Sequence, residues 1–245
     1  MNDSSFENLN TMEYSVIIPA RNEQELLQRS INSVRTALKK RPAEIIVVLN
    51  RCTDKTAEIA IENTCLTVVN DQKNLSLIRN AGVGIATGRF IVTIDADSIL
   101  SSNTFDEIEK AINLGAIGGA VPILPERFSI GIVLTIIFLI PILIFRGLSC
   151  GLFFTERKTF NEMGGFDPKL CSAEDIDFAK RLKAYGKRHK KKFVILWKSP
   201  IYTSCRKFDR LGDWYFILHP FKCLTLLRGR NQAAADEVWY DFPRS

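Results

Sequence analysis

The sequence has little of what marks a disulfide-rich, zinc-binding or nucleic-acid-binding protein. It contains six cysteines and two histidines in 245 residues, and the cysteines are scattered without a C-x-x-C pair. This spacing is a poor disulfide framework and a poor zinc pattern, so we expect reduced thiols in a cytoplasmic protein. The sequence also lacks an RNP-like aromatic strand and a paired Cys/His finger, so we expect no nucleic-acid partner.

Targeting segments, internal repeats and low-complexity stretches are also missing. Residues 1–10 are polar, without a basic segment followed by an apolar one, so we expect residues 1–12 to be a flexible N-terminus and not a signal peptide. Hydrophobic residues make up 46% and charged residues 24% of the chain, which is typical of a globular protein. The length fits a single α/β domain.

Positive charge is in excess, and the excess lies late in the chain. The net charge is +6, and basic residues concentrate in 187–192 and 198–210. Such a cluster suits anionic lipid or a phosphorylated substrate, but it is equally the solvated face of an ordinary domain. Charge alone therefore leaves the partner open.

Strand and helix patterns alternate along the first half of the sequence. Short apolar runs predict strands at 14–19, 44–49, 66–69, 89–94 and 116–123. Helical spacing predicts helices at 23–40, 54–63, 75–86 and 102–113, and later at 159–163 and 174–185, with further strands at 150–155 and 192–197. This order predicts an α/β fold with a mainly parallel sheet and helices on both faces.

Ligands of such sheets bind at the carboxyl ends of the strands, where this sequence is polar. Asp95 and Asp97 follow a predicted strand as a D-x-D triplet, and two carboxylates suit Mg²⁺ or Mn²⁺. The alternative is a turn with a capping aspartate. A second acidic group, Glu174 to Asp177, begins a predicted helix, where capping alone would explain negative charge.

Six short motifs together resemble glycosyltransferase family 2, whose members have the GT-A fold. In family order they are VIIPARNE (16–23), IVVLNRCTDKT (46–56), RNAGVGIATG (79–88), IDAD (94–97), GGFD (164–167) and EDIDFAKRL (174–182). The resemblance covers about residues 13–200. It implies a GT-A domain over 13–205, with a donor-binding half (13–125) and an acceptor and catalytic half (126–205), and a C-terminal extension (206–245) packed on the same domain.

The resemblance also implies a reaction and its residues. A sugar would pass from a nucleotide-diphosphate sugar to a hydroxyl of a glycan or lipid-linked acceptor, with inversion in a single displacement. Asp175 would be the general base. Asp97, with Asp95, would hold Mg²⁺ or Mn²⁺, which neutralises the departing diphosphate. His219 is a further candidate metal ligand, although a lone late histidine is often structural.

The remaining site residues implied by the family fall into two groups. The donor side would comprise Ala20, Arg21, Glu23, Asn50, Arg79, Asp95 and Ala96, and the acceptor side Gly165 and Glu174. One departure stands out: family members commonly carry an aspartate pair where this chain has Leu49 and Asn50. That departure weakens any inference that the base of the donor is uracil.

One apolar segment complicates this interpretation. Residues 128–145 carry no charge, and a helix of that length is about 27 Å long, at the lower limit of a membrane span. A single crossing would place Asp97 and Asp175 on opposite sides of the membrane, so the site could not form. We expect the segment to be buried, to form a homodimer contact, or to lie on the inner face of the membrane with help from the lysine cluster.

Three rival functions stay open. A sugar-phosphate nucleotidyltransferase usually has a glycine-rich first loop, which residues 19–23 lack. A non-catalytic binding protein of GT-A fold is favoured by Leu49 but opposed by the intact Asp97 and Asp175. A single-pass membrane protein is opposed by the topology of the proposed site.

Overall fold

The computed structural model describes residues 12–146 and 151–236. The expected flexible N-terminus lies outside the described residues apart from Met12, as does Cys150 at the start of a predicted strand.

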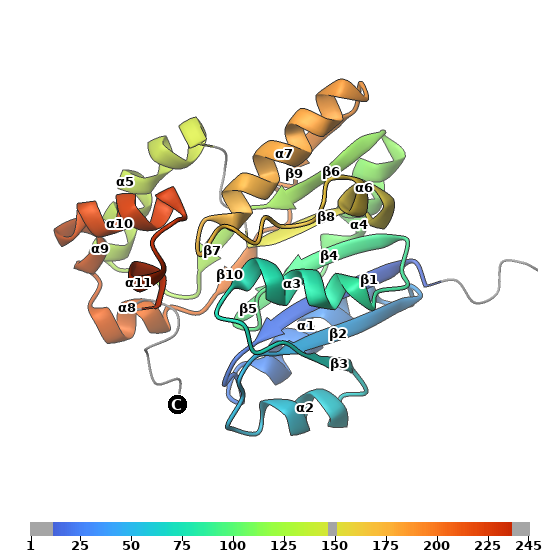
Figure 1. Cartoon of the computed structure of the whole chain (residues 1–245), viewed down its shortest axis with the longest axis horizontal. Helices are drawn as coiled ribbons and strands as arrows, with labels where there is room; N and C mark the ends of the chain where they lie inside the picture. Colours follow the sequence, from blue (N-terminus) through green and yellow to red (C-terminus); the bar gives the residue numbers. More distant parts are fainter. Residues whose placement is uncertain (1–11, 147–150, 237–245) are drawn as a thin grey trace, which may run out of the picture.

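A seven-stranded sheet forms the centre of the molecule, with the strand order β3-β2-β1-β4-β8-β6-β9 (Figure 1). The strands are β1 (Tyr14–Ala20), β2 (Ala43–Leu49), β3 (Leu66–Val69), β4 (Phe90–Ile94), β6 (Ala116–Val121), β8 (Leu152–Glu156) and β9 (Lys192–Ile195). β8 runs antiparallel to both of its neighbours, β4 and β6, and the other pairings are parallel. The mainly parallel sheet expected from the sequence is therefore confirmed.

Helices cover both faces of this sheet. On one face lie α1 (Leu27–Leu38), α2 (Thr56–Glu62) and α4 (Thr104–Asn113), and on the other α3 (Leu75–Gly84), α6 (Arg157–Glu162) and α7 (Glu174–Arg188). The alternation of β1 explains the two layers, because Val16 and Ile18 enter the first core whereas Ile17 enters the second. A parallel strand buried on both faces is mostly apolar, as β1 is apart from Ser15.

A second, three-stranded sheet has the order β5-β10-β7 and was not predicted. Its strands are β5 (Ser98–Leu100), β7 (Ile123–Pro125) and β10 (Ile201–Thr203). Three residues are too few to show a period in a sequence. The pairing of β10 with β5 matters for function because it carries the start of the C-terminal region to the residues that follow β4.

Several predicted boundaries were wrong, for local reasons. The strand predicted at 116–123 ends at Val121 because Pro122 has no N–H to donate. The helix predicted to end at Gly186 continues to Arg188, since Gly186 packs on Ile117 where a Cβ would lie 2.8 Å from its Cγ2. The first helix begins only at Leu27.

The apolar segment forms α5 (Ile130–Arg146), which lies beside the C-terminal helices on one side of the molecule (Figure 1). Those helices are α8 (Arg206–Leu211), α9 (Tyr215–Leu218), α10 (Pro220–Arg228) and α11 (Gln232–Ala235). Arg127, just before α5, forms ion pairs with Asp209 and Asp213. Among the described residues, no helix has the length and apolar character to cross a membrane.

Candidate functional site

The polar residues predicted from the strand ends gather at one edge of the sheet. β1 and β2 are in register to their last residues, Ala20 and Leu49, and the N–H of Asn50 donates to the carbonyl of Ala20. Asp95 follows β4, whose partner is β1. Ala20 and Ala96 are buried. Of the predicted donor-side residues, Arg21 is partly exposed.

Left-handed backbone conformations mark the loops of this edge. Asn22, Arg51 and Ala173 have φ values of 48°, 50° and 54°. These loops follow β1 and β2 and precede α7, respectively. Such conformations are strained in residues other than glycine and concentrate at functional sites. Three of the six described non-glycine residues with positive φ therefore lie in loops that hold the sequence motifs, and the other three, Lys39, Thr64 and Lys190, lie elsewhere.

Asn50 is almost fully buried, and its side chain fastens the chain that follows β3. Its Nδ2 donates to the carbonyls of Asn70 (2.6 Å) and Gln72 (2.9 Å). Its Oδ1 is also buried and has no hydrogen-bond partner within the described part of the chain. Asn50 therefore offers an acceptor oxygen, where the family usually has a carboxylate.

Arg79 joins the donor side of the site to the start of α7. Its Nη2 lies 2.7 Å from Asp95 Oδ1 and its Nη1 lies 2.5 Å from Glu174 Oε1. The side chains of Arg79 and Glu174 are 6% and 8% exposed, whereas that of Asp95 is 38% exposed. Burial raises the pKa of the Glu174 carboxyl, even though the charge of Arg79 acts in the opposite direction. Arg79 and Glu174 thus form a buried ion pair at the residue that precedes Asp175.

Asp175 lies in the first turn of α7, next to Glu174 of this ion pair. It is partly exposed, and its Oδ1 accepts a hydrogen bond from the N–H of Ile176 (2.8 Å). Asp177, the other end of the second D-x-D triplet, pairs with Arg181 at 2.6 Å. Asp177 is thus held by Arg181, and the role of Asp175 as a base stays a prediction.

The GGFD loop fixes the start of α7 by aromatic packing. Phe166 is fully buried and stacks on Phe178, with ring centroids 4.5 Å apart. Gly165, predicted on the acceptor side, has φ +66°, and a Cβ there would lie 2.6 Å from Asn80 Oδ1. Its observed contacts are those of a tight turn, and its acceptor role stays a prediction.

Asp97 meets a cation from the C-terminal region. Arg206 Nη2 lies 2.7 Å from Glu23 Oε1 and 3.3 Å from Asp97 Oδ2. The side chain of Glu23 is 4% exposed and that of Asp97 is 16% exposed. This contact was missed at the sequence level. The late basic residues were noticed, but nothing in their spacing connects position 206 with position 97.

The carboxylates of Asp95 and Asp97 are compatible with a divalent cation that is also bound by substrate phosphates. No group of three or more His, Cys, Asp or Glu side chains suited to a metal occurs in the described ranges. However, Mg²⁺ is commonly held by one or two carboxylates together with substrate phosphates and water. Asp97, with Asp95 two residues earlier, supplies that minimal set.

His219 is not brought into such a group. It is exposed at the end of α9, where its ring stacks on Tyr215 and its Nδ1 lies 2.9 Å from the carbonyl oxygen of the same residue. These local contacts account for its position. Its role as a metal ligand stays a prediction without support from the geometry.

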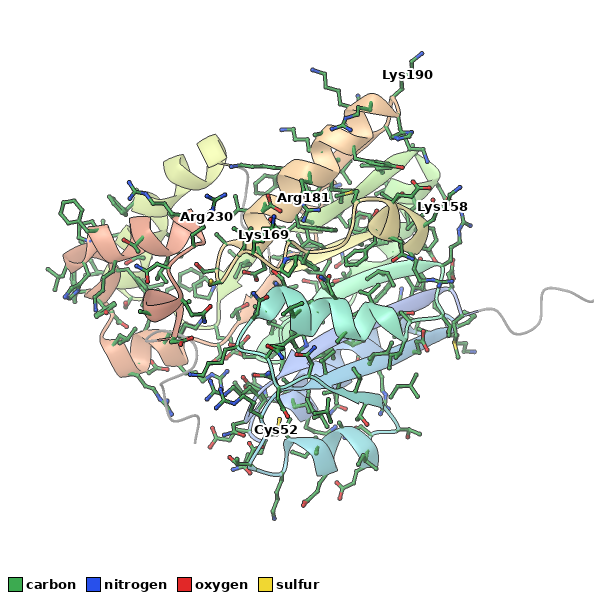
Figure 2. The ribbon with its side chains drawn as sticks, in the orientation of Figure 1. Cys52, Lys158, Lys169, Arg181, Lys190 and Arg230 are labelled. Carbon is green, nitrogen blue, oxygen red and sulfur yellow. The ribbon has the colours of Figure 1, made fainter. Side chains whose placement is uncertain are left out.

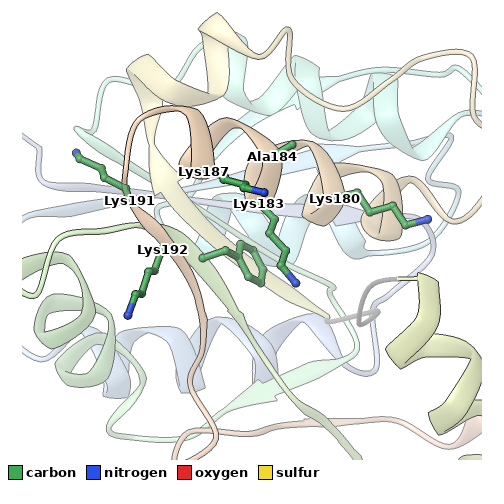
Figure 3. Close-up of a pocket in the computed structure, with 7 residues that line it drawn as sticks. Lys180, Lys183, Ala184, Lys187, Lys191 and Lys192 are labelled. Carbon is green, nitrogen blue, oxygen red and sulfur yellow. The ribbon is translucent and has the colours of Figure 1, made fainter.

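An open hollow of about 500 Å³ lies between the later part of α7 and β9 (Figure 3). It is lined by Lys180, Lys183, Ala184, Lys187, Lys191, Lys192 and Phe193. Lys190 projects at the far end of α7 (Figure 2), opposite to the end that carries Glu174. Within the described part of the chain, none of the five lining lysines forms an ion pair, so the hollow is strongly cationic.

Comparisons with known proteins agree with this geometry. Residues 15–131 match the family described as Glycosyl transferase family 2. No match was found among curated proteins. Among solved structures, S. aureus TarS 1–349 superposes with a TM-score of 0.62 at 17% identity, over 93% of this chain and 69% of that chain. The TarS 1–349 complex with UDP-GlcNAc has a TM-score of 0.62 at 18% identity, over 94% of this chain and 71% of that chain. A mycobacterial protein has a TM-score of 0.53 at 16% identity, over 79% of this chain and 66% of that chain.

At these identities the structural matches establish the fold, and the family match covers the segment that holds the first four motifs. Residues 15–131 therefore belong to glycosyl transferase family 2, and the chain has a GT-A-like fold.

Proposed function

We propose that this chain is an inverting, divalent-metal-dependent glycosyltransferase that uses a nucleotide-diphosphate sugar, with Asp97 at the metal and Asp175 as the base. The observation that carries the proposal is the double ion pair of Arg79. Because Arg79 contacts both Asp95 and Glu174, the loop after β4 and the start of α7 are drawn to one place. A donor held at the first would present its sugar to the second.

The reaction assigns a separate task to each group. Asp175 accepts the proton of the acceptor hydroxyl, whose oxygen attacks the anomeric carbon from the face opposite the diphosphate. A divalent cation, when bound, supplies compensation for the charge on the leaving diphosphate. Arg79 pairs with Glu174, and so fixes the first turn of α7, which carries Asp175. A single displacement inverts the anomeric configuration.

The nucleoside would lie against the ends of β1 and β2. The unpartnered Oδ1 of Asn50 suits an N–H donor on the base, such as those of uracil, thymine or guanine. S. aureus TarS was solved with UDP and with UDP-GlcNAc, which favours a uridine donor as the first to test.

The reaction is tested by measuring the release of nucleoside diphosphate. Each candidate sugar nucleotide is incubated with Mn²⁺ and candidate acceptors. Asp175→Asn is expected to reduce turnover by roughly 10²–10⁴-fold, the range for loss of a general base. Asp177→Asn is the matched control, since Asp177 lies in the same helical turn but pairs with Arg181. Equal turnover in wild type and Asp175→Asn, or a product of retained configuration by NMR, would contradict the mechanism.

We also propose that α5 lies on an anionic membrane, which fits a lipid-linked acceptor. Along α5 the residues Ile130, Val133, Leu134, Ile137 and Phe138 are exposed, at the i, i+3, i+4, i+7, i+8 spacing of one helical face. Ile132 and Thr135 on the other face are buried. Such a continuous exposed apolar stripe is unusual on a water-facing surface. The cationic hollow of α7 and β9 supplies the charge that anionic lipids attract.

Flotation with vesicles of phosphatidylcholine, with and without phosphatidylserine, tests this surface. The double variant Ile137→Ser/Phe138→Ser is expected to lose binding, because it removes apolar area from the stripe. Leu114→Ser is the matched control, since Leu114 is 80% exposed at the end of α4 and outside the stripe. Unchanged flotation of the double variant, or a concentration-dependent dimer that it abolishes, would refute the membrane contact.

A further inference from the structure

Arg206, in the C-terminal helices, bonds to two carboxylates at the candidate donor site. It is the first residue of α8, and its guanidinium bridges Glu23, after β1, and Asp97, after β4. The side chain is 27% exposed. Its position is therefore that of a half-buried cation between two site carboxylates.

The backbone that carries Arg206 is held rigidly beside Asp97. Thr203 pairs with Ser98 in the small sheet, and their hydroxyls lie 2.8 Å apart. The N–H of Ser204 donates to the carbonyl of Asp97 (3.1 Å). Because these anchors lie two and three residues before Arg206, we expect a change at Arg206 to be a movement of its side chain.

The charge of Arg206 conflicts with metal binding at the same carboxylate. A divalent cation on Asp97 would lie a few ångströms from the guanidinium, where like charges repel. An arginine also has the planar fork of N–H groups that pairs with two phosphate oxygens at once. A nucleotide diphosphate bound to that cation would place such oxygens beside Arg206.

We propose that Arg206 neutralises Asp97 in the metal-free enzyme and turns to the diphosphate of the donor when a divalent cation takes Asp97. The proposal rests on the function proposed above. Arg206 is then a donor-binding residue contributed by the C-terminal region, and Glu23 holds its guanidinium nearby in both states. The exchange couples the two affinities, since the cation and the diphosphate favour the same movement.

Two binding measurements on purified protein test the exchange without any turnover. The first is Mn²⁺ affinity by electron paramagnetic resonance without nucleotide, and the second is affinity for pyrophosphate and for UDP by calorimetry in saturating Mn²⁺. Arg206→Gln is expected to bind Mn²⁺ alone about 5-fold or more tightly, because the competing charge is gone. It is expected to bind the two diphosphates roughly 10-fold or more weakly, because a charged hydrogen bond is lost.

Matched variants separate this role from a structural one. Arg210→Ala removes the same charge from an exposed position of α8 and is expected to leave both affinities unchanged. Arg206→Lys keeps the charge without the fork, and is expected to keep wild-type Mn²⁺ affinity while losing diphosphate affinity. Glutamine retains a hydrogen-bond donor for Glu23, so Arg206→Gln should fold, as circular dichroism will check.

The outcomes are distinguishable. If wild type binds Mn²⁺ and pyrophosphate but Arg206→Gln alters neither affinity, or weakens both, the exchange is wrong and the proposed function stands. If wild type binds no Mn²⁺ with or without pyrophosphate, both the exchange and the metal-dependent function are wrong.

Discussion

Replacing Arg79 with methionine should destabilise the protein by leaving a buried carboxylate without its cation. Removing one partner of a buried ion pair commonly costs about 3–5 kcal/mol. Here the side chain of Asp95 is 38% exposed and can be solvated, whereas that of Glu174 is 8% exposed and cannot. We therefore expect a loss near the lower limit, about 3 kcal/mol in the free energy of unfolding at pH 7.

The pH dependence of this loss identifies Glu174 as its source. Burial already raises the pKa of Glu174, and loss of Arg79 raises it further. Above the ordinary carboxyl pKa of about 4.3, the folded variant then binds more protons than the unfolded chain, so its stability falls as pH rises. Arg79→Met should accordingly lose more stability between pH 5 and pH 8 than wild type does. The nearby carboxylates Asp175 and Asp95 act in the same direction.

Urea denaturation at pH 5, 6.5 and 8 measures the effect in wild type, Arg79→Met, Glu174→Gln and the double variant. The double variant should be less destabilised than the sum of the two single variants, by about 1–3 kcal/mol, and should lose the added pH dependence. A cost below about 1 kcal/mol for Arg79→Met, or additive effects, would refute the claim that this buried bridge holds the site together.

Two further predictions concern the packing of the donor half. Gly82→Ala should destabilise the protein by about 1–3 kcal/mol, because its Cβ would lie 2.5 Å from Ile17 Cγ2. Gly84→Ala is the control, since its Cβ would meet nothing within 4 Å and should cause no overpacking. Thermal denaturation of both variants checks this. Glu44 is buried, which opposes its ionisation, but hydrogen bonds from the Ser15 hydroxyl and from residues 87–88 lower its pKa. That stabilisation is present above the ordinary carboxyl pKa and lost as pH falls through the lowered one. Glu44→Gln should therefore show less acid sensitivity in urea titrations between pH 3 and pH 7.

Much of the sheet could be predicted because its parallel strands are buried on both faces. Such strands are nearly continuous apolar runs, broken in β1 only by Ser15 and in β4 only by Thr93, and each is followed by polar residues. Asp95 and Asp97 could be placed at the edge of the sheet for the same reason. The antiparallel direction of β8 could not be predicted, since an apolar run carries no sign of direction.

The contacts between distant segments could not be predicted from the sequence. Arg206 meets Asp97 across more than 100 positions, through two strands too short to show a period. The sequence of α5 is apolar on all sides, so it could not show which face the C-terminal helices cover. The structure shows it by burying Ile132 while leaving Ile137 exposed.

The central claim is that Asp97 binds a divalent cation together with a nucleotide-diphosphate sugar. Its most direct test is the melting temperature of wild type and Asp97→Ala with UDP-, GDP-, dTDP- and CDP-sugars, each with and without Mn²⁺. At 100 times its dissociation constant a donor adds about 2.7 kcal/mol of stability, or about 5–10 °C for a domain of this size. We predict such a shift for one nucleotide, dependent on Mn²⁺ and lost in Asp97→Ala. A folded wild type that shows no shift with any donor, or the same shift in Asp97→Ala, would contradict the claim.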